Sequence, residues 1–159
     1  SDVYKRQQLN NNPKPSMLLA VSLPKITDKS EYAYRFNLGS EDEAIAMSQF
    51  MIENKYDSIA VVYLNDEFGV GAWEVFKEKF ESGGGLVTSV ETYTKEQTDF
   101  KSIILKLKSS KQQGVYVIGY VQASVLCIKQ MRELGFSKQV FANMALSVPS
   151  FIKTGQEVE

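Results

Sequence analysis

The stretch SIAVVYLNDEFGVGAW, Ser58 to Trp73, contains the pattern that decides the fold of this chain. Within it, Ile59 to Leu64 is a continuous apolar run, and Val61 and Val62 at its centre are β-branched. Such a run is typical of a strand that is buried on both faces of a parallel sheet. The polar residues Asn65 to Glu67 follow the run and predict a loop.

A helix is predicted next, from about Val70 to Glu81. Its apolar residues recur at helical spacing, at Val70, Trp73, Phe76 and Phe80. Gly83 to Gly85 follow and are expected to end the helix, because glycine adopts the left-handed cap conformation without steric cost. The stretch is therefore a strand, a loop and a helix. In open α/β sheets, ligands bind just beyond the carboxyl ends of such strands.

The alternation of strand and helix patterns continues along the chain. Further strands are predicted at Met17–Val21, Tyr32–Phe36, Leu86–Tyr93, Gly114–Tyr120 and Gln139–Asn143. Further helices are predicted at 40–54, 100–107 and 123–134, with one more helical turn at 149–153. This order predicts an α/β fold, with a mostly parallel sheet flanked by helices on both faces.

Capping signals precede or begin two of these helices, the one that starts at about residue 40 and the one that starts at about residue 100. Ser40 and Glu43 have the spacing of a capping box, in which the Ser40 hydroxyl accepts from the Glu43 amide and the Glu43 carboxylate reaches back to residue 40. Thr98 and Asp99 precede the next helix but one and are expected to cap it.

The composition excludes several classes of function. The chain has 159 residues, 43% apolar content and a net charge of −1, which indicates one globular domain without a basic face for nucleic acid. It has no histidine, which removes Ser-His-Asp catalysis and histidine-containing metal sites. Cys127 is the one cysteine, and its helical spacing indicates a small buried hydrophobe. No cofactor or metal is expected.

The candidate site lies at the predicted edge where the loops after the strands gather. Phe68 and Tyr120 each follow an apolar strand, so both rings are expected at this edge, facing a ligand. The alternative is that the two rings only cover the end of the core. A dinucleotide-binding loop is disfavoured, because the Gly69-x-Gly71 pair lacks the third glycine and follows two acids.

Asp66 and Glu67 are adjacent acids at the end of the first long strand. A magnesium-dependent phosphorylation site would need a further aspartate at another strand end, and none is present there. Paired-carboxylate catalysis is disfavoured as well, because neighbours in a loop often point in opposite directions. We therefore expect two solvated turn residues, one of which caps the following helix.

The order of several segments resembles the second lobe of a type I periplasmic binding protein, of the branched-chain amino-acid binding (leucine/isoleucine/valine-type) family of ABC importers. The matching segments are YAYRFN with Arg35, SIAVVYLNDEFGVGAWEVFKEKFESGGG, TDFKSIILKLK, GVYVIGY and CIKQMRELGF. In that family, two α/β lobes close on a ligand like a hinged clamp.

The resemblance implies roles for individual residues. Phe68 takes the position of an aromatic residue, usually Tyr, that packs on the ligand, and Tyr120 takes that of a second aromatic contact. A third position, occupied in the family by an acid that pairs with the ligand ammonium, is Met144 in this chain. Either Asp66 or Glu67 replaces that acid, or the ligand is not an α-amino acid.

The resemblance also implies a division of the chain and its partners. Residues 1–16 are expected to be a flexible or foreign leader, 17–37 a crossover segment, and 38–159 the second lobe of a protein whose first lobe is missing. Asp66 and Gln122 would offer polar contacts to an amino acid or a similar small molecule. The protein would act outside the cytoplasm and deliver its solute to a membrane permease, and the isolated lobe could self-associate.

Two other readings remain open at this point. The same fold serves as the effector-sensing domain of repressors and receptors, and flanking segments would distinguish that class. A flavodoxin-like enzyme or receiver domain is the third, and the missing histidine and acceptor aspartate count against it.

Overall fold

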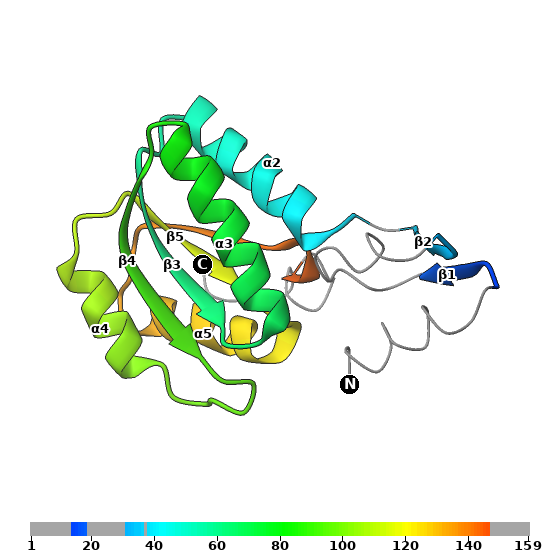
Figure 1. Cartoon of the computed structure of the whole chain (residues 1–159). Helices are drawn as coiled ribbons and strands as arrows, with labels where there is room; N and C mark the ends of the chain where they lie inside the picture. Colours follow the sequence, from blue (N-terminus) through cyan, green and yellow to red (C-terminus); the bar gives the residue numbers. More distant parts are fainter. Residues whose placement is uncertain (1–13, 19–30, 37, 147–159) are drawn as a thin grey trace.

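The structure is a computed structural model that describes residues 14–18, 31–36 and 38–146 (Figure 1). Its strands are β1 (Ser16–Leu18), β2 (Ala33–Arg35), β3 (Ser58–Leu64), β4 (Leu86–Tyr93), β5 (Gly114–Ile118) and β6 (Gln139–Ala142). Its helices are α2 (Ser40–Glu53), α3 (Glu67–Ser82), α4 (Lys101–Ser109), α5 (Val121–Glu133) and the short 3-10 helix η1 (Met144–Leu146). The predicted turn at 149–153, residues 19–21 and most of the predicted leader lie outside the described residues.

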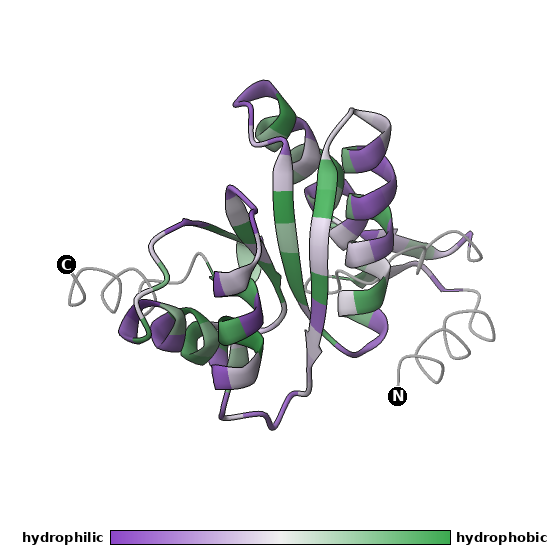
Figure 2. Ribbon diagram, turned by 90° about the vertical axis from the view of Figure 1, so that its left-hand side faces the viewer, coloured by the Kyte–Doolittle hydropathy of each residue, from purple (hydrophilic) through white to green (hydrophobic). Residues whose placement is uncertain are grey.

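The main sheet has four strands in the order β4-β3-β5-β6, and every pair is parallel. Helices α2 and α3 pack on one face, and α4 and α5 pack on the other. Figure 2 shows the result as apolar strands between helices that carry both polar and apolar residues. The predicted α/β class is confirmed. A second, two-stranded parallel sheet of β1 and β2 lies to one side, beyond the start of α2 (Figure 1).

Strand β3 is an inner strand of the sheet and is buried on both faces, as its apolar run predicts. It pairs with β4 on one side and β5 on the other, so its backbone groups are satisfied on both edges. Ile59, Val61 and Phe76 join the core on the face of α2 and α3, while Ala60 and Val62 join the core on the face of α4 and α5. A strand in this position has no solvated face, which explains why its sequence does not alternate.

Helix α3 begins earlier than its apolar pattern predicts. It starts at Glu67 rather than Val70, and Asp66 is its N-cap, because the Asp66 carboxylate accepts a hydrogen bond of 2.8 Å from the Gly69 amide. This confirms the expectation that one of the two acids caps the helix. The helix ends at Ser82, and Gly84 takes the positive φ of 92° that the glycine run predicted.

The predicted cap of α2 is wrong by one residue. Gly39 is the N-cap, and its amide donates to the Asp42 carboxylate over 3.1 Å, while the Ser40 hydroxyl is buried without a hydrogen-bond partner in the described part of the chain. The run Ser40–Glu43 offers acids at three successive positions, so spacing alone does not fix which acid reaches back. The Glu43 carboxylate instead accepts from the Met144 amide.

Helix α4, in contrast to α2 and α3, begins later than predicted. Lys101 is its first residue and Phe100 its N-cap, rather than Thr98 or Asp99. The Asp99 carboxylate still accepts a hydrogen bond of 2.9 Å from the Lys101 amide, so it satisfies one of the amides at the helix start. No helix in the described ranges is long and apolar enough to cross a membrane.

Candidate functional site

The carboxyl ends of the parallel strands bring the two predicted aromatic residues together. Phe68, in the first turn of α3, and Tyr120, the N-cap of α5, stack with ring centroids 5.1 Å apart and an interplanar angle of 21°. The two residues are 52 positions apart in the sequence, but β3 and β5 are neighbours in the sheet. The prediction that both rings lie at one edge is therefore confirmed.

The two rings differ in exposure, which corrects one expectation. Tyr120 is 46% exposed, whereas Phe68 is only 5% exposed and belongs to the core on the face of α2 and α3. Phe68 therefore does not face outward as expected, because its ring lies between Tyr120 and that core. For Phe68 the alternative interpretation holds, since it covers the end of the core. Tyr120 is the ring of the stacked pair that is exposed to solvent.

A buried polar network fixes the backbone that carries Tyr120. The Tyr93 hydroxyl donates to the Ile118 carbonyl over 3.1 Å and lies 2.8 Å from the Ser124 hydroxyl, while the Gly119 amide donates to the Asn143 side chain over 3.0 Å. Burial is the main reason that the pKa of Tyr93 rises to about 12. Tyr93 therefore stays protonated, and can donate, at any ordinary pH.

Gly119 is required at the centre of this network. A Cβ atom at this position would lie 1.8 Å from the Tyr93 hydroxyl oxygen and 2.8 Å from that of Ser124. The sequence analysis did not find the network, because its members lie in β4, β5 and α5 and directly after β6. The Gly-Tyr pair at the end of an apolar strand was the one available signal.

Met144 lies at the same edge, next to Glu43, which the sequence analysis did not place at the candidate site. The amide of Met144 donates to the Glu43 carboxylate, and the Met144 side chain is 52% exposed. Burial raises the pKa of the Glu43 carboxyl, and the hydrogen bond from Met144 partly offsets that rise. The pKa of the buried Tyr116 is raised as well, first by burial and second by the charge of Glu43.

The other predicted polar residues lie at this edge but differ in their contacts. Asp66 has one carboxylate oxygen on the Gly69 amide, so its first role is to cap α3. Gln122 is the second residue of α5 and is exposed. Glu67 is the first residue of α3 and is exposed as well.

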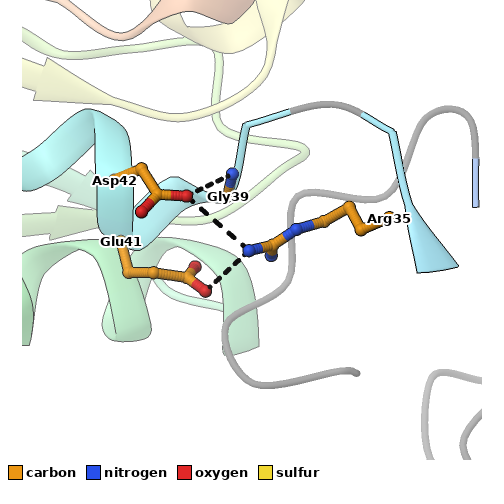
Figure 3. A network of polar contacts seen from close by, with 4 residues as sticks. All are labelled: Arg35, Gly39, Glu41 and Asp42. Carbon is orange, nitrogen blue, oxygen red and sulfur yellow. Dashed lines mark hydrogen bonds and ion pairs between the residues drawn. The ribbon is translucent and has the colours of Figure 1, made fainter. Parts of the chain in front are cut away.

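A charged network joins β2 to the start of α2 (Figure 3). The Arg35 guanidinium lies 3.0 Å from the Glu41 carboxylate and 3.7 Å from that of Asp42, which also accepts from the Gly39 amide. The Arg35 side chain is only 16% exposed. This network fixes the segment that leads into α2 against the first turn of that helix.

The described part of the chain offers no metal centre. No group of three His, Cys, Asp or Glu side chains could hold a metal ion in those residues. Cys127 is fully buried, as predicted, and burial raises its pKa to about 12, so its thiol is protonated and inaccessible. The edge can contact a ligand through an aromatic ring, a thioether and amide groups.

The family follows from comparison with known proteins. A family model described as periplasmic binding protein matches residues 6–157, nearly the whole chain. The chain belongs to the periplasmic binding protein family. The resemblance inferred from the sequence segments is thereby confirmed.

Two curated relatives of this periplasmic binding protein are leucine/isoleucine/valine-binding proteins. The Leu/Ile/Val-binding protein homolog 3 of Brucella melitensis is 27% identical over 106 residues, which are 66% of this chain and 29% of that protein. The Leu/Ile/Val-binding protein BraC3 of Rhizobium johnstonii is 24% identical over 118 residues, which are 74% of this chain and 32% of that protein. The matched region therefore spans about a third of each relative.

Solved structures share the fold of this periplasmic binding protein. The leucine-binding protein LivK of Thermotoga maritima gives a TM-score of 0.85 at 22% identity, covering 99% of this chain and 45% of that one. The solute-binding protein of an ABC transporter from Rhodopseudomonas palustris HaA2, in complex with p-hydroxybenzoic acid, gives 0.86 at 17% identity, covering 97% and 44%. These likenesses confirm the predicted α/β lobe, with its parallel sheet flanked by helices.

Proposed function

We propose that this chain is one lobe of a longer, two-lobe solute-binding protein that serves an ABC importer outside the cytoplasm. Family membership supports the proposal, together with the coverage of 44% and 45% of the two solved structures. Residues 17–37 would be the crossover segment and 38–159 the second lobe. The protein would bind and deliver a solute without catalysis, cofactor or metal, and its partner would be a membrane permease.

The observation that carries the proposal is the stacked pair of rings at the carboxyl edge of the sheet. Tyr120 would contact the ligand directly, with Phe68 holding its ring from beneath. Met144 and Gln122 are both exposed, at the starts of η1 and α5. Together with the carboxylate of Asp66, they would provide the remaining contacts to the ligand. This lobe is thus proposed to grip one side of a small molecule, and a second lobe the other.

Two ligand classes are suggested by the proteins that this chain resembles. Curated relatives are named for leucine, isoleucine and valine, and one solved structure holds p-hydroxybenzoic acid. Both classes combine a carboxylate with an apolar body, and an aromatic ring packs well on such a body. An amino acid or a related small carboxylic acid is therefore the proposed solute.

The test is calorimetric titration of the protein encoded by the complete reading frame around this chain. L-leucine, L-isoleucine and 4-hydroxybenzoate are the probes, and one of them is expected to bind. Tyr120→Ala should weaken that binding about fivefold or more, because stacking contributes beyond the area that is buried. An affinity within twofold of the parent would show that Tyr120 is not in the site.

Leu86→Ala provides the matched control. Leu86 is 61% exposed and begins β4, so it lies at the amino edge of the sheet, opposite the proposed site. Its replacement should leave the affinity unchanged. The alternative function is an effector-sensing domain, and the sequence of the complete reading frame distinguishes the two. A helix-turn-helix before this lobe would favour a repressor, and a secretion signal would favour the importer.

A further inference from the structure

We infer that the outer face of helices α4 and α5 is a docking surface for the anionic headgroups of a membrane. The inference goes beyond the proposed solute binding, and its test needs no solute. It follows from the division of charge between the two helical layers, from an exposed leucine among the lysines of α4, and from the contacts that join α4 to α5.

The two helical layers carry opposite charge, although the net charge of the whole chain is only −1. Helices α2 and α3 contain eight acids and two lysines, whereas α4 and α5 contain four lysines, one arginine and one acid. The two layers lie on opposite faces of the sheet (Figure 1). The nearly neutral sum indicated no basic face, but the layer of α4 and α5 is basic, because a sum over the chain does not show where its charges lie.

The acidic layer does not cancel the positive charge at the surface of the basic layer. The sheet stands between the two layers, and each layer packs about 10 Å from it. The Debye length at physiological ionic strength is about 8 Å, so the acids of the far layer are largely screened at the face of α4 and α5. An anionic surface is therefore attracted to this face and repelled by the opposite one.

Helix α4 presents an exposed leucine among its lysines. Lys101, Leu105 and Lys108 have the spacing i, i+4 and i+7, so they form one stripe along the helix, and all three are exposed. Leu105 is 61% exposed, whereas Ile104 and Leu107 are fully buried in the core. An apolar side chain between cations suits the boundary between lipid headgroups and acyl chains, where amphipathic segments bind.

Helix α5 continues the same basic face. The Lys108 ammonium donates to the Leu134 carbonyl over 2.6 Å, which joins α4 to the end of α5. Lys129 and Arg132 are exposed on α5, and the Arg132 guanidinium donates to the Phe136 carbonyl over 2.7 Å. The acceptors in these two bonds are uncharged carbonyl groups, so Lys108 and Arg132 are not neutralised by them.

Two ion pairs reduce the positive charge of this face without removing it. Lys106 lies 2.8 Å from Glu91, and Lys129 lies 3.8 Å from Glu133. The lysine side chains of the two pairs are 63% and 50% exposed, and ion pairs near solvent contribute little, so lipid phosphates can compete with these carboxylates. Lys101 forms no ion pair with an acid in the described part of the chain.

The arrangement favours a membrane over other anionic partners. The cations are distributed over two adjacent helices, and an extended anionic surface can contact all of them at once, whereas a small anion cannot. The exposed side chain of Leu105 favours lipid over an acidic polypeptide, because the headgroup boundary can take up an apolar group.

The experiment measures the partition of the protein of the complete reading frame onto lipid vesicles by co-sedimentation. Vesicles of phosphatidylcholine with about 30% phosphatidylglycerol are compared with vesicles of phosphatidylcholine alone, at about 0.05 M and about 0.5 M salt. The partition coefficient should be about tenfold larger on the anionic vesicles at low salt, and most of this difference should vanish at high salt. Equal partition onto the two kinds of vesicle would overturn the inference.

A pair of double variants ties the result to this face. Lys101→Gln with Lys106→Gln should lower partition onto the anionic vesicles about tenfold, because each lysine near an anionic surface contributes to binding. Lys77→Gln with Lys79→Gln is the matched control, since it removes the same charge from α3, and Lys79, like Lys106, lies 2.8 Å from a glutamate. The control should stay within about twofold of the parent. Equal losses in the two double variants would show that net charge decides, and would overturn the inference.

Leu105→Ser distinguishes a lipid surface from an acidic protein partner. It should lower partition onto the anionic vesicles about threefold, because the serine has no apolar group to bury. Poly-L-glutamate is the comparison anion and should bind more weakly than the vesicles. Binding of poly-L-glutamate as tight as that of the vesicles, with no effect of Leu105→Ser on the vesicles, would overturn the membrane in favour of an acidic protein. Thermal unfolding checks that each variant is folded, and none of these results bears on the solute titrations.

Discussion

Two networks hold the starts of helices at the carboxyl edge of the sheet, and their chemistry differs. At α2, Arg35 bridges Glu41 and Asp42 in a charged group that is partly exposed. At α5, Tyr93, Ser124 and Asn143 hold the Gly119 turn through neutral groups that are all buried. Charged groups near solvent are screened and contribute little, whereas each buried neutral group must be paired. The α5 network should therefore tolerate change far less than the α2 network.

The largest effect is expected from Gly119→Ala. The added methyl group would meet the Tyr93 hydroxyl at 1.8 Å, so the turn or the ring must move. We expect the free energy of unfolding of the 159-residue chain to fall by about 3 kcal/mol, measured by urea denaturation. Tyr93→Phe in the same background removes the nearest atom and should recover part of the loss. Independent, additive losses would contradict the contact.

The next effect is that of Tyr93→Phe alone. It removes the donor to the Ile118 carbonyl and the partner of the Ser124 hydroxyl, so a loss of about 1–2 kcal/mol is expected from thermal or urea unfolding. A loss no larger than that of an exposed tyrosine, such as Tyr34→Phe, would show that the network contributes nothing.

The same variant has a signature at high pH. The pKa of Tyr93 is raised to about 12 in the folded chain from the ordinary value of 10.0, so the folded state holds this proton more tightly. Its contribution to stability is full below about pH 10 and is lost as the pH rises toward 12. Stability should therefore fall less steeply over that interval in Tyr93→Phe than in the parent. Identical slopes would mean that Tyr93 titrates normally.

A smaller effect is expected at the charged network. Arg35→Gln should cost about 1 kcal/mol at low ionic strength and clearly less in 1 M salt, because salt screens partly exposed charges. Lys79→Gln is the matched control, since Lys79 lies 2.8 Å from Glu78 in a pair that is more exposed. A loss at Arg35 that does not depend on salt would indicate packing of the side chain rather than its charge.

The smallest effect concerns Glu43 and appears as a change with pH. Burial raises the pKa of the Glu43 carboxyl, so the folded state binds a proton before the unfolded state does. Relative to Glu43→Gln, the parent should therefore gain stability as the pH falls from neutral through that raised pKa. The difference between their melting temperatures from pH 7 to pH 4 measures this. A difference that stays constant would show that Glu43 has an ordinary pKa.

Periodicity and composition predicted most of the fold, because strand burial and helix faces are local patterns. The unbroken apolar run of β3 predicted a strand buried on both faces, and one of the two acids Asp66 and Glu67 was predicted to cap the following helix. The cap of α2 was predicted one residue late. Several acids stand in its first turn, so the spacing had more than one solution.

The sequence predicted the edge of the sheet at which the candidate site lies, but not how deeply each of its side chains is buried. Strand ends located Phe68 and Tyr120 at one edge, but only coordinates show that Phe68 is buried beneath Tyr120. The hydrogen bond between Glu43 and Met144 joins residues 101 positions apart, and no local pattern encodes it. The Tyr93 network was missed for the same reason, since it depends on the order of strands in the sheet.

The sealed environment of Cys127 makes this chain convenient for optical sensing. It is the one thiol in the sequence, it is fully buried, and its raised pKa keeps it unreactive toward maleimide dyes. A new cysteine introduced by Gln122→Cys would then be the one reactive thiol for labelling, two residues after Tyr120 in the first turn of α5. In the proposed solute-binding protein, a fluorophore attached there would report binding at this edge as a change in emission, and the native Cys127 would not have to be replaced first.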